Sequence, residues 1–89
     1  MDEETIFAQV TEAIVRSNRD VAHATIHADA SLVADLGMDS MRLAALIGEL
    51  KARFGDVDLT GWYVTTARHG ADTVRGLVDF LCRALAAAP

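Results

Sequence analysis

Three segments of the chain repeat apolar residues at helical spacing, and this constrains the fold more than any other feature. Apolar residues three or four positions apart lie on one face of a helix. The first stripe is Ile6, Phe7, Val10 and Ile14; the second is Leu43, Leu46, Ile47, Leu50 and Phe54; the third is Val74, Leu77, Val78, Leu81 and Leu85. We therefore expect helices over about residues 3–16 and 40–54, and a last helix through the third stripe. Asp72 or Thr73 would cap that last helix.

A fourth segment, from Leu59 to about Ala67, has a weaker pattern. Thr60 or Gly61 would cap a brief helix there, although its β-branched residues also allow a short strand. The chain has no second strand pattern with which such a strand could pair, so we expect a helix that ends at His69-Gly70. Because each apolar stripe must be covered by another, the predicted fold is all-α: a small four-helix bundle of three main helices and a short third one.

A long loop is predicted between the first two helices, from Ser17 to Met38, because this stretch has no sustained periodicity. One helical turn is expected near residues 31–34. The apolar residues expected to hold the loop on the core are Ile26, Leu32 and Leu36. Structureless loops of this length are uncommon in compact domains and are often functional.

Composition excludes several classes of function. The 89 residues predict a single domain with an ordered core of about residues 3–85. A net charge of −5 argues against nucleic acid as a partner. No basic and apolar leader opens the sequence, and no apolar run approaches about 18 residues, so we expect no membrane association. The lone Cys82, expected to pack beside the last stripe, forms no internal disulfide, which suits a monomer in a reducing cytoplasm.

The string DLGMDS, at residues 35–40, stands at the start of the second predicted helix. A phosphate on Ser40 would lie in a favourable field, because the first N–H groups of a helix are unpaired and its dipole is positive there. Gly37 allows a tight turn, and Asp39 indicates an exposed junction. The alternative is that Ser40 only caps the helix. A self-activated catalytic serine is disfavoured, because no histidine is near in sequence and the local string lacks the G-x-S-x-G pattern.

This pattern resembles the acyl and peptidyl carrier proteins. Their signature, D-x-G-x-D-S-[LM], heads the second helix of a four-helix bundle, and residues 35–41 here read DLGMDSM. The resemblance covers nearly the whole chain, with the helices and the long loop in the family's order. It implies that a phosphopantetheinyl transferase moves 4′-phosphopantetheine from coenzyme A onto the Ser40 hydroxyl. The thiol of that arm would then hold a substrate as a thioester.

The resemblance also implies roles for the neighbours of Ser40. Asp39 would position the transferase's metal ion or a basic residue of a partner, and Gly37 and Met38 would shape the loop. Met41 would contact partner enzymes beside the arm. The chain would be a carrier and not an enzyme, served by a loading enzyme and by downstream synthase or tailoring enzymes.

One departure from the family concerns charge. Fatty-acid-synthesis carriers have a strongly acidic second helix, whereas residues 40–54 here hold three basic residues against one acid, a net charge of +2. We expect docking through a small, largely apolar face that comprises Met41, Arg42, Ala44, Ala45 and Gly48. This favours a discrete carrier of polyketide or nonribosomal peptide metabolism. The alternatives are a fatty-acid carrier with atypical charge, an unmodified helical interaction module and, least favoured, an autonomous hydrolase.

Three residue pairs have weaker functional interpretations. His23 and His27 are four apart, as in a metal pair on a helix, but they fall in the predicted loop without a nearby glutamate, so we expect solvated histidines and no metal site. Trp62 and Tyr63 either pack at the rim of the core or border the arm or a bound acyl group. Arg68 and His69 would meet the phosphate only if the short helix folds back toward Ser40.

Overall fold

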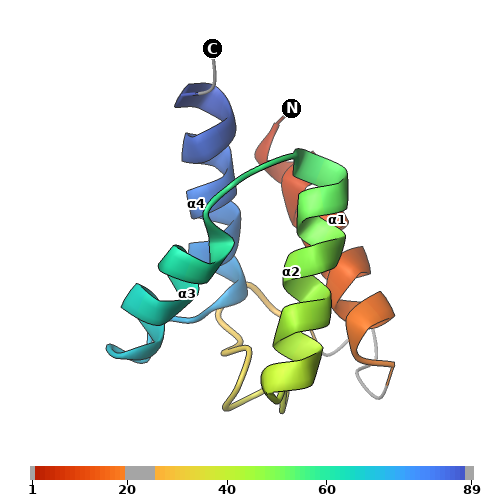
Figure 1. Cartoon of the computed structure of the whole chain (residues 1–89), viewed down its shortest axis with the longest axis vertical. Coiled ribbons are helices and arrows are strands. Elements are labelled where there is room, and N and C mark those ends of the chain that lie inside the picture. The colour runs from red at the N-terminus through yellow and green to blue at the C-terminus, as the bar shows by residue number, and fades with distance from the viewer. Residues whose placement is uncertain (1, 20–25, 88–89) are drawn as a thin grey trace.

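The computed structural model describes residues 2–19 and 26–87 and folds them into four helices (Figure 1). They are α1 (Glu3–Ser17), α2 (Ser40–Phe54), α3 (Leu59–Ala67) and α4 (Val74–Ala87). The predicted all-α fold is confirmed. The segment from Leu59 to Ala67, which was expected to form a helix in preference to a strand, is the helix α3. The last helix continues two residues past the expected ordered core. The β-bridge found in the described residues is an isolated antiparallel one that joins Ser31 and Thr73.

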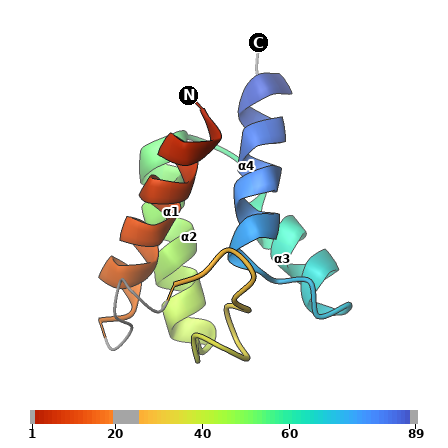
Figure 2. The same ribbon diagram turned by 180° about the vertical axis from the view of Figure 1, so that it is seen from behind.

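The predicted apolar stripes form one core. α1 packs against both α2 and α4, while α3 lies beside the start of α4 on the side away from α1 (Figures 1 and 2). Among the helix residues, the large apolar side chains with 2% exposure or less are Ile6, Val10 and Ile14 of α1, Leu46 and Leu50 of α2, Leu59 of α3, and Val74, Leu77, Val78 and Leu81 of α4. Each such side chain contributes about 1.5–3 kcal/mol of transfer free energy. Phe7, Ile47, Phe54 and Leu85 are only partly buried at the edge of this core.

Aspartates cap the first and third helices. The carboxylate of Asp2 accepts the Thr5 N–H at 2.8 Å, and hydrogen bonds from the Thr5 side chain and backbone lower the pKa of Asp2 below its ordinary value. Asp58 accepts the Gly61 N–H at 3.0 Å, so the expectation that Thr60 or Gly61 caps α3 is wrong. Gly61 instead lets this carboxylate approach closely, because a Cβ at residue 61 would lie 2.3 Å from an Asp58 oxygen.

The two candidate caps of α4 have different roles. Thr73 caps the helix, because its hydroxyl accepts the Gly76 N–H at 3.0 Å. Asp72 is 5% exposed, and its carboxylate lies against Ser31 and Val33 of the segment between α1 and α2. The start of α4 therefore bonds to a part of the chain about 40 residues earlier in sequence.

The described part of the connection between α1 and α2, residues 26–39, runs across one end of the bundle and passes below α4 (Figure 2). Ile26, Leu32 and Leu36 are buried as expected. Ala30 and Met38, which the pattern did not single out, are buried as well. The expected turn at residues 31–34 is present, and the Ser31 carbonyl accepts the N–H groups of Asp35 and Leu36 at 3.1 and 3.0 Å.

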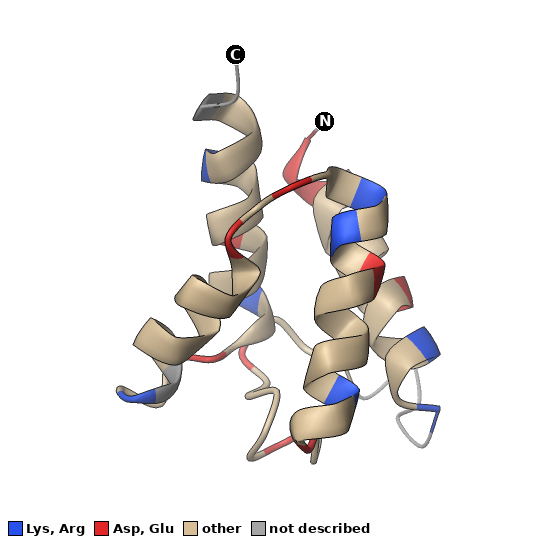
Figure 3. Cartoon of the chain, viewed as in Figure 1, with Lys and Arg blue, Asp and Glu red and all other residues tan. Residues whose placement is uncertain are grey.

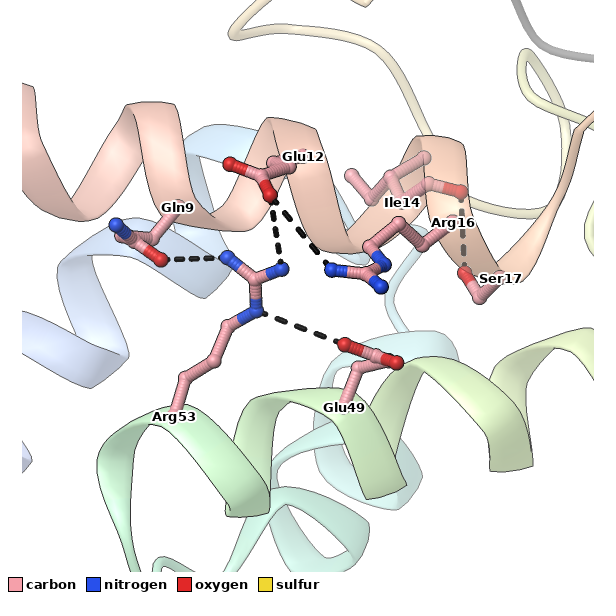
Figure 4. A network of polar contacts seen from close by, with 7 residues as sticks. All are labelled: Gln9, Glu12, Ile14, Arg16, Ser17, Glu49 and Arg53. Atoms are coloured by element: carbon pink, nitrogen blue, oxygen red, sulfur yellow. Dashed lines mark hydrogen bonds and ion pairs between the residues drawn. The ribbon is translucent and has the colours of Figure 1, made fainter.

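Arg53, near the end of α2, joins this helix to α1 (Figure 4). Its guanidinium donates to Gln9 and to Glu12, the latter at 3.2 Å, and lies 3.6 Å from the Glu49 carboxylate. The Arg53 side chain is only 16% exposed, whereas those of Glu12 and Glu49 are 54% and 36% exposed. The positive charge of Arg53, which the sequence analysis included in the net charge of the second helix, therefore lies between α1 and α2.

We expect Arg53→Ala to lower the free energy of unfolding by about 1–2 kcal/mol, through loss of charge-assisted hydrogen bonds and of the packed stem. The matched variant Lys51→Ala removes an exposed charge from the same last turn and should stay within about 0.5 kcal/mol of the wild type. Urea denaturation of both variants gives the two values. Equal losses would show that the Arg53 contacts contribute nothing specific.

Candidate functional site

Asp39 caps the start of α2. This residue has extended backbone angles, φ −90° and ψ −179°, and its carboxylate accepts the Arg42 N–H at 2.9 Å. Its carbonyl accepts the Leu43 N–H, also at 2.9 Å. These contacts make Asp39 the N-cap and Ser40 the first residue within the helix. The alternative that Ser40 is the cap is wrong, because the carboxylate one residue earlier has that position.

The Ser40 hydroxyl is exposed and makes no hydrogen bond to any residue in 2–19 or 26–87. Asp39 takes one of the orphan N–H groups at this helix end, that of Arg42. The N–H groups of Ser40 and Met41 have no protein partner within those same ranges. A phosphate on Ser40 would therefore find two unpaired donors and the positive end of the helix dipole. The residues present fit a phosphopantetheine group attached at this oxygen.

The chain reaches Ser40 through a tight turn. Gly37 has φ +66°, in the left-handed region that glycine adopts without strain. Its N–H donates to the Val33 carbonyl at 3.1 Å, and the Met38 N–H donates to the Leu32 carbonyl at 3.0 Å. The Met38 side chain is 2% exposed and that of Met41 is 83% exposed. The backbone thus passes from a buried anchor to the surface within three residues.

Four of the five predicted docking residues lie on one exposed strip of α2. Met41, Ala44, Ala45 and Gly48 are all exposed, at the i, i+3, i+4 and i+7 spacing of a helix face. A Cβ placed on Gly48 would meet nothing within 4 Å, so the strip is flat at that point. Arg42, the fifth predicted residue, is half-buried.

Two of the three basic residues of α2 lie in its last turn, away from Ser40. The middle of the helix has little charge, with basic residues toward both ends (Figure 3). Lys51 is eleven residues beyond Ser40, about 16 Å along the helix axis, and Arg53 is engaged by α1. Of the three basic residues, only Arg42 lies in the first turn. The exposed strip of α2 that follows Ser40 is therefore largely apolar.

Trp62 and Tyr63 of α3 are half-buried and pack at the rim of the core. The Trp62 ring lies 6.2 Å from the ring of Phe80 at a tilt of 37°. Both residues line an apolar cavity between α2, α3 and α4 whose other walls include Leu46, Ile47, Leu59 and Leu77. Its volume is about 10 Å³, which holds at most a single water molecule. In this conformation the two aromatic residues act as packing residues.

The remaining candidate residues are not assembled with Ser40. Arg68 and His69 are exposed at the end of α3 that points away from α2 (Figure 1). The short helix therefore does not fold back toward Ser40, which was the condition for these two residues to meet a phosphate there. His27 is exposed, and His23 lies outside the described residues. No cluster of three or more His, Cys, Asp or Glu able to hold a metal ion exists in the parts of the chain that the structure describes.

Comparison with protein families identifies a carrier. Residues 8–61 match the family model described as the phosphopantetheine attachment site. The chain belongs to this family. It is therefore a carrier protein that holds a covalent 4′-phosphopantetheine group and works with a phosphopantetheinyl transferase and partner enzymes. Domains of this kind are non-catalytic, so the carrier is not itself an enzyme.

Searches of curated proteins and of solved structures returned no match to this carrier. Within residues 2–19 and 26–87, no helix combines the length and the apolar character needed to cross a membrane.

The capping geometry predicts opposite outcomes at two adjacent residues. We expect Asp39→Ala to lower the free energy of unfolding by about 1 kcal/mol, because it removes the acceptor for the Arg42 N–H. Ser40→Ala should stay within about 0.5 kcal/mol of the wild type, because the hydroxyl has no partner to lose. Asp39→Asn keeps an oxygen acceptor and serves as the control. A larger loss for Ser40→Ala than for Asp39→Ala in thermal and urea unfolding would contradict this assignment of the cap.

Proposed function

We propose that Ser40 is the residue to which the phosphopantetheine group is attached. The chain has three serines, and all of them fall within the matched residues 8–61. The proposal rests on which of their hydroxyls are already hydrogen-bonded and which is exposed. The hydroxyl of Ser17 donates to the Ile14 carbonyl at 3.1 Å, and that of Ser31 donates to the Asp72 carboxylate at 3.2 Å. Ser40 alone among them has an exposed hydroxyl with no partner in the described residues.

The residues around Ser40 suit a reaction directed by another enzyme. The Ser40 oxygen attacks the phosphorus of coenzyme A that bears the pantetheine arm, its proton passes to a base of the transferase, and adenosine 3′,5′-bisphosphate leaves. The transferase also supplies the metal ion. One Asp39 oxygen is occupied by the Arg42 N–H, which leaves the other for the transferase's metal ion or a basic side chain. Once attached, the group supplies a terminal thiol that carries acyl or aminoacyl cargo as a thioester.

Partner enzymes would dock on the exposed strip of α2 that follows Ser40. Met41 presents a large apolar side chain at 83% exposure, and Ala44, Ala45 and Gly48 let a partner backbone or helix approach closely. We assign this strip to the loading enzyme and to downstream synthase or tailoring enzymes. The whole chain would act as a single, monomeric carrier domain.

The same strip favours specialised metabolism, polyketide or nonribosomal peptide, as the setting. Docking through an acidic second helix relies on charge pairing with a basic partner, and this carrier has no acidic residue in the first turn of α2. Its Glu49 is engaged by Arg53. Contacts beside Ser40 would depend on shape and apolar burial, which suits dedicated partners. A fatty-acid carrier with atypical charge is the competing assignment.

The attachment residue is tested by coexpression with a broad-specificity phosphopantetheinyl transferase, followed by intact mass. We expect the wild type to gain the mass of one phosphopantetheine and Ser40→Ala to gain none. Ser17→Ala is the matched control, because it also removes a serine hydroxyl from residues 8–61, and it should be modified like the wild type. Modification of Ser40→Ala, or an unmodified wild type beside a modified reference carrier, would disprove the assignment.

The pathway assignment is tested by loading the phosphopantetheine form with a malonyl transferase of fatty-acid synthesis. We expect weak loading that improves at least about threefold at low salt in the double variant Ala44→Glu/Ala45→Glu, which makes the strip acidic. The control is Ala8→Glu, an added acid on the exposed face of α1, which should change nothing. Wild-type loading as fast as that of a fatty-acid carrier would favour the competing assignment.

A further inference from the structure

Ser31 stands between two parts of the molecule and bonds to both. Its hydroxyl donates to the Asp72 carboxylate, with both oxygens at 3.2 Å. The same hydroxyl accepts the Ala34 N–H at 3.0 Å. Its backbone N–H donates to the Asp35 carboxylate at 2.7 Å, and its carbonyl accepts two further N–H groups of the turn. The hydroxyl, the N–H and the carbonyl of Ser31 are therefore all hydrogen-bonded, to the start of α4 and to the turn that leads to Ser40.

On one side is the start of α4. The buried Asp72 carboxylate also accepts the Val33 N–H at 3.3 Å, and the Asp72 carbonyl accepts the Leu32 N–H at 2.8 Å. Two more backbone bonds run in the opposite direction, from the N–H groups of residues 74 and 75 to the carbonyls of residues 30 and 28, at 3.0 and 2.7 Å. Together these contacts fasten residues 28–33 to residues 72–75.

On the other side is the turn that leads to Ser40. The carbonyls of Leu32 and Val33 accept the N–H groups of Met38 and Gly37. Met38 is two residues before Ser40, and two trans peptide units span at most about 7.6 Å between Cα atoms. Residues 31–38, which are fixed to α4 at Asp72, therefore constrain where α2 begins, together with the packing of α2 on α1.

We propose that Ser31 and Asp72 are a positioning pair for the modification of Ser40. The pair holds the turn at residues 31–38 in the conformation that presents the Ser40 hydroxyl to the transferase. This inference rests on the proposed attachment at Ser40. Neither residue touches the reacting atoms, and both act through the turn. Without the Ser31 hydroxyl, both Asp72 and the Ala34 N–H lose a partner, and the turn samples conformations in which Ser40 is displaced.

A positioning role and a merely stabilising role predict different kinetics. A protein of ordinary stability stays almost fully folded after losing one or two hydrogen bonds, so global destabilisation alone leaves the reaction with the transferase unchanged. A displaced turn instead lowers the fraction of folded carrier that is competent to bind. The apparent affinity falls by that fraction, while the rate at saturation is unaffected.

The experiment is steady-state kinetics of a purified phosphopantetheinyl transferase with coenzyme A and varied concentrations of the unmodified carrier. We expect Ser31→Ala to raise KM for the carrier at least about threefold with kcat unchanged. Ser31→Thr keeps the hydroxyl and should restore KM to within about twofold of the wild type. Asp72→Asn, which keeps one oxygen acceptor, should give a KM between those of the wild type and Ser31→Ala.

Asp2→Ala is the control for stability, because it removes a helix cap from α1, far from this turn in sequence. It should lower the unfolding midpoint without changing KM. An unchanged KM in Ser31→Ala, or a fall in kcat at constant KM, overturns the positioning role while the attachment at Ser40 stands. A wild-type chain that gains no mass overturns the attachment, and the pair's role with it.

Discussion

The bonds between the α1–α2 connection and the start of α4 are the contacts on which the site depends. Residues 26–39 contain no helix, yet Leu32 is 1% exposed and Met38 is 2% exposed. Backbone that is buried without regular structure needs partners for its N–H and C=O groups. Here residues 28–33 find them in residues 72–75 and in their own turn. Ser40 is thereby placed at the surface by a segment that is itself anchored in the core.

The helices were predictable because the patterns that specify them are local. The spacing of Leu43, Leu46 and Leu50 indicates a helix whatever the rest of the chain does, and α2 has the predicted bounds. The hydrogen bonds between the α1–α2 connection and the start of α4 were not predictable. These two segments are about 40 residues apart, and no periodicity in the sequence indicates that they are in contact. Asp72 and Thr73 both resemble caps in sequence, and only the fold separates their roles.

The site itself was partly readable from the string DLGMDS. The positive φ of Gly37 and the exposure of Ser40 follow from residue types that favour a turn and a helix start. Sequence reasoning gave Asp39 a recognition role only, and the structure adds that one oxygen of its carboxylate caps α2. It also counted Arg53 in the charge of the α2 surface. The direction of a side chain such as Arg53 depends on which helix lies beside it, and a sequence of one chain does not show this.

The central claim is that the site around Ser40 is formed before modification, held by the turn at residues 31–38. Residue-resolved amide hydrogen exchange of the unmodified protein tests it most directly. The account predicts that the Gly37 and Met38 amides, bonded to the carbonyls of Val33 and Leu32, exchange far more slowly than the unpartnered amides of Ser40 and Met41. Exchange of Gly37 and Met38 at the rates of an unstructured peptide would contradict it.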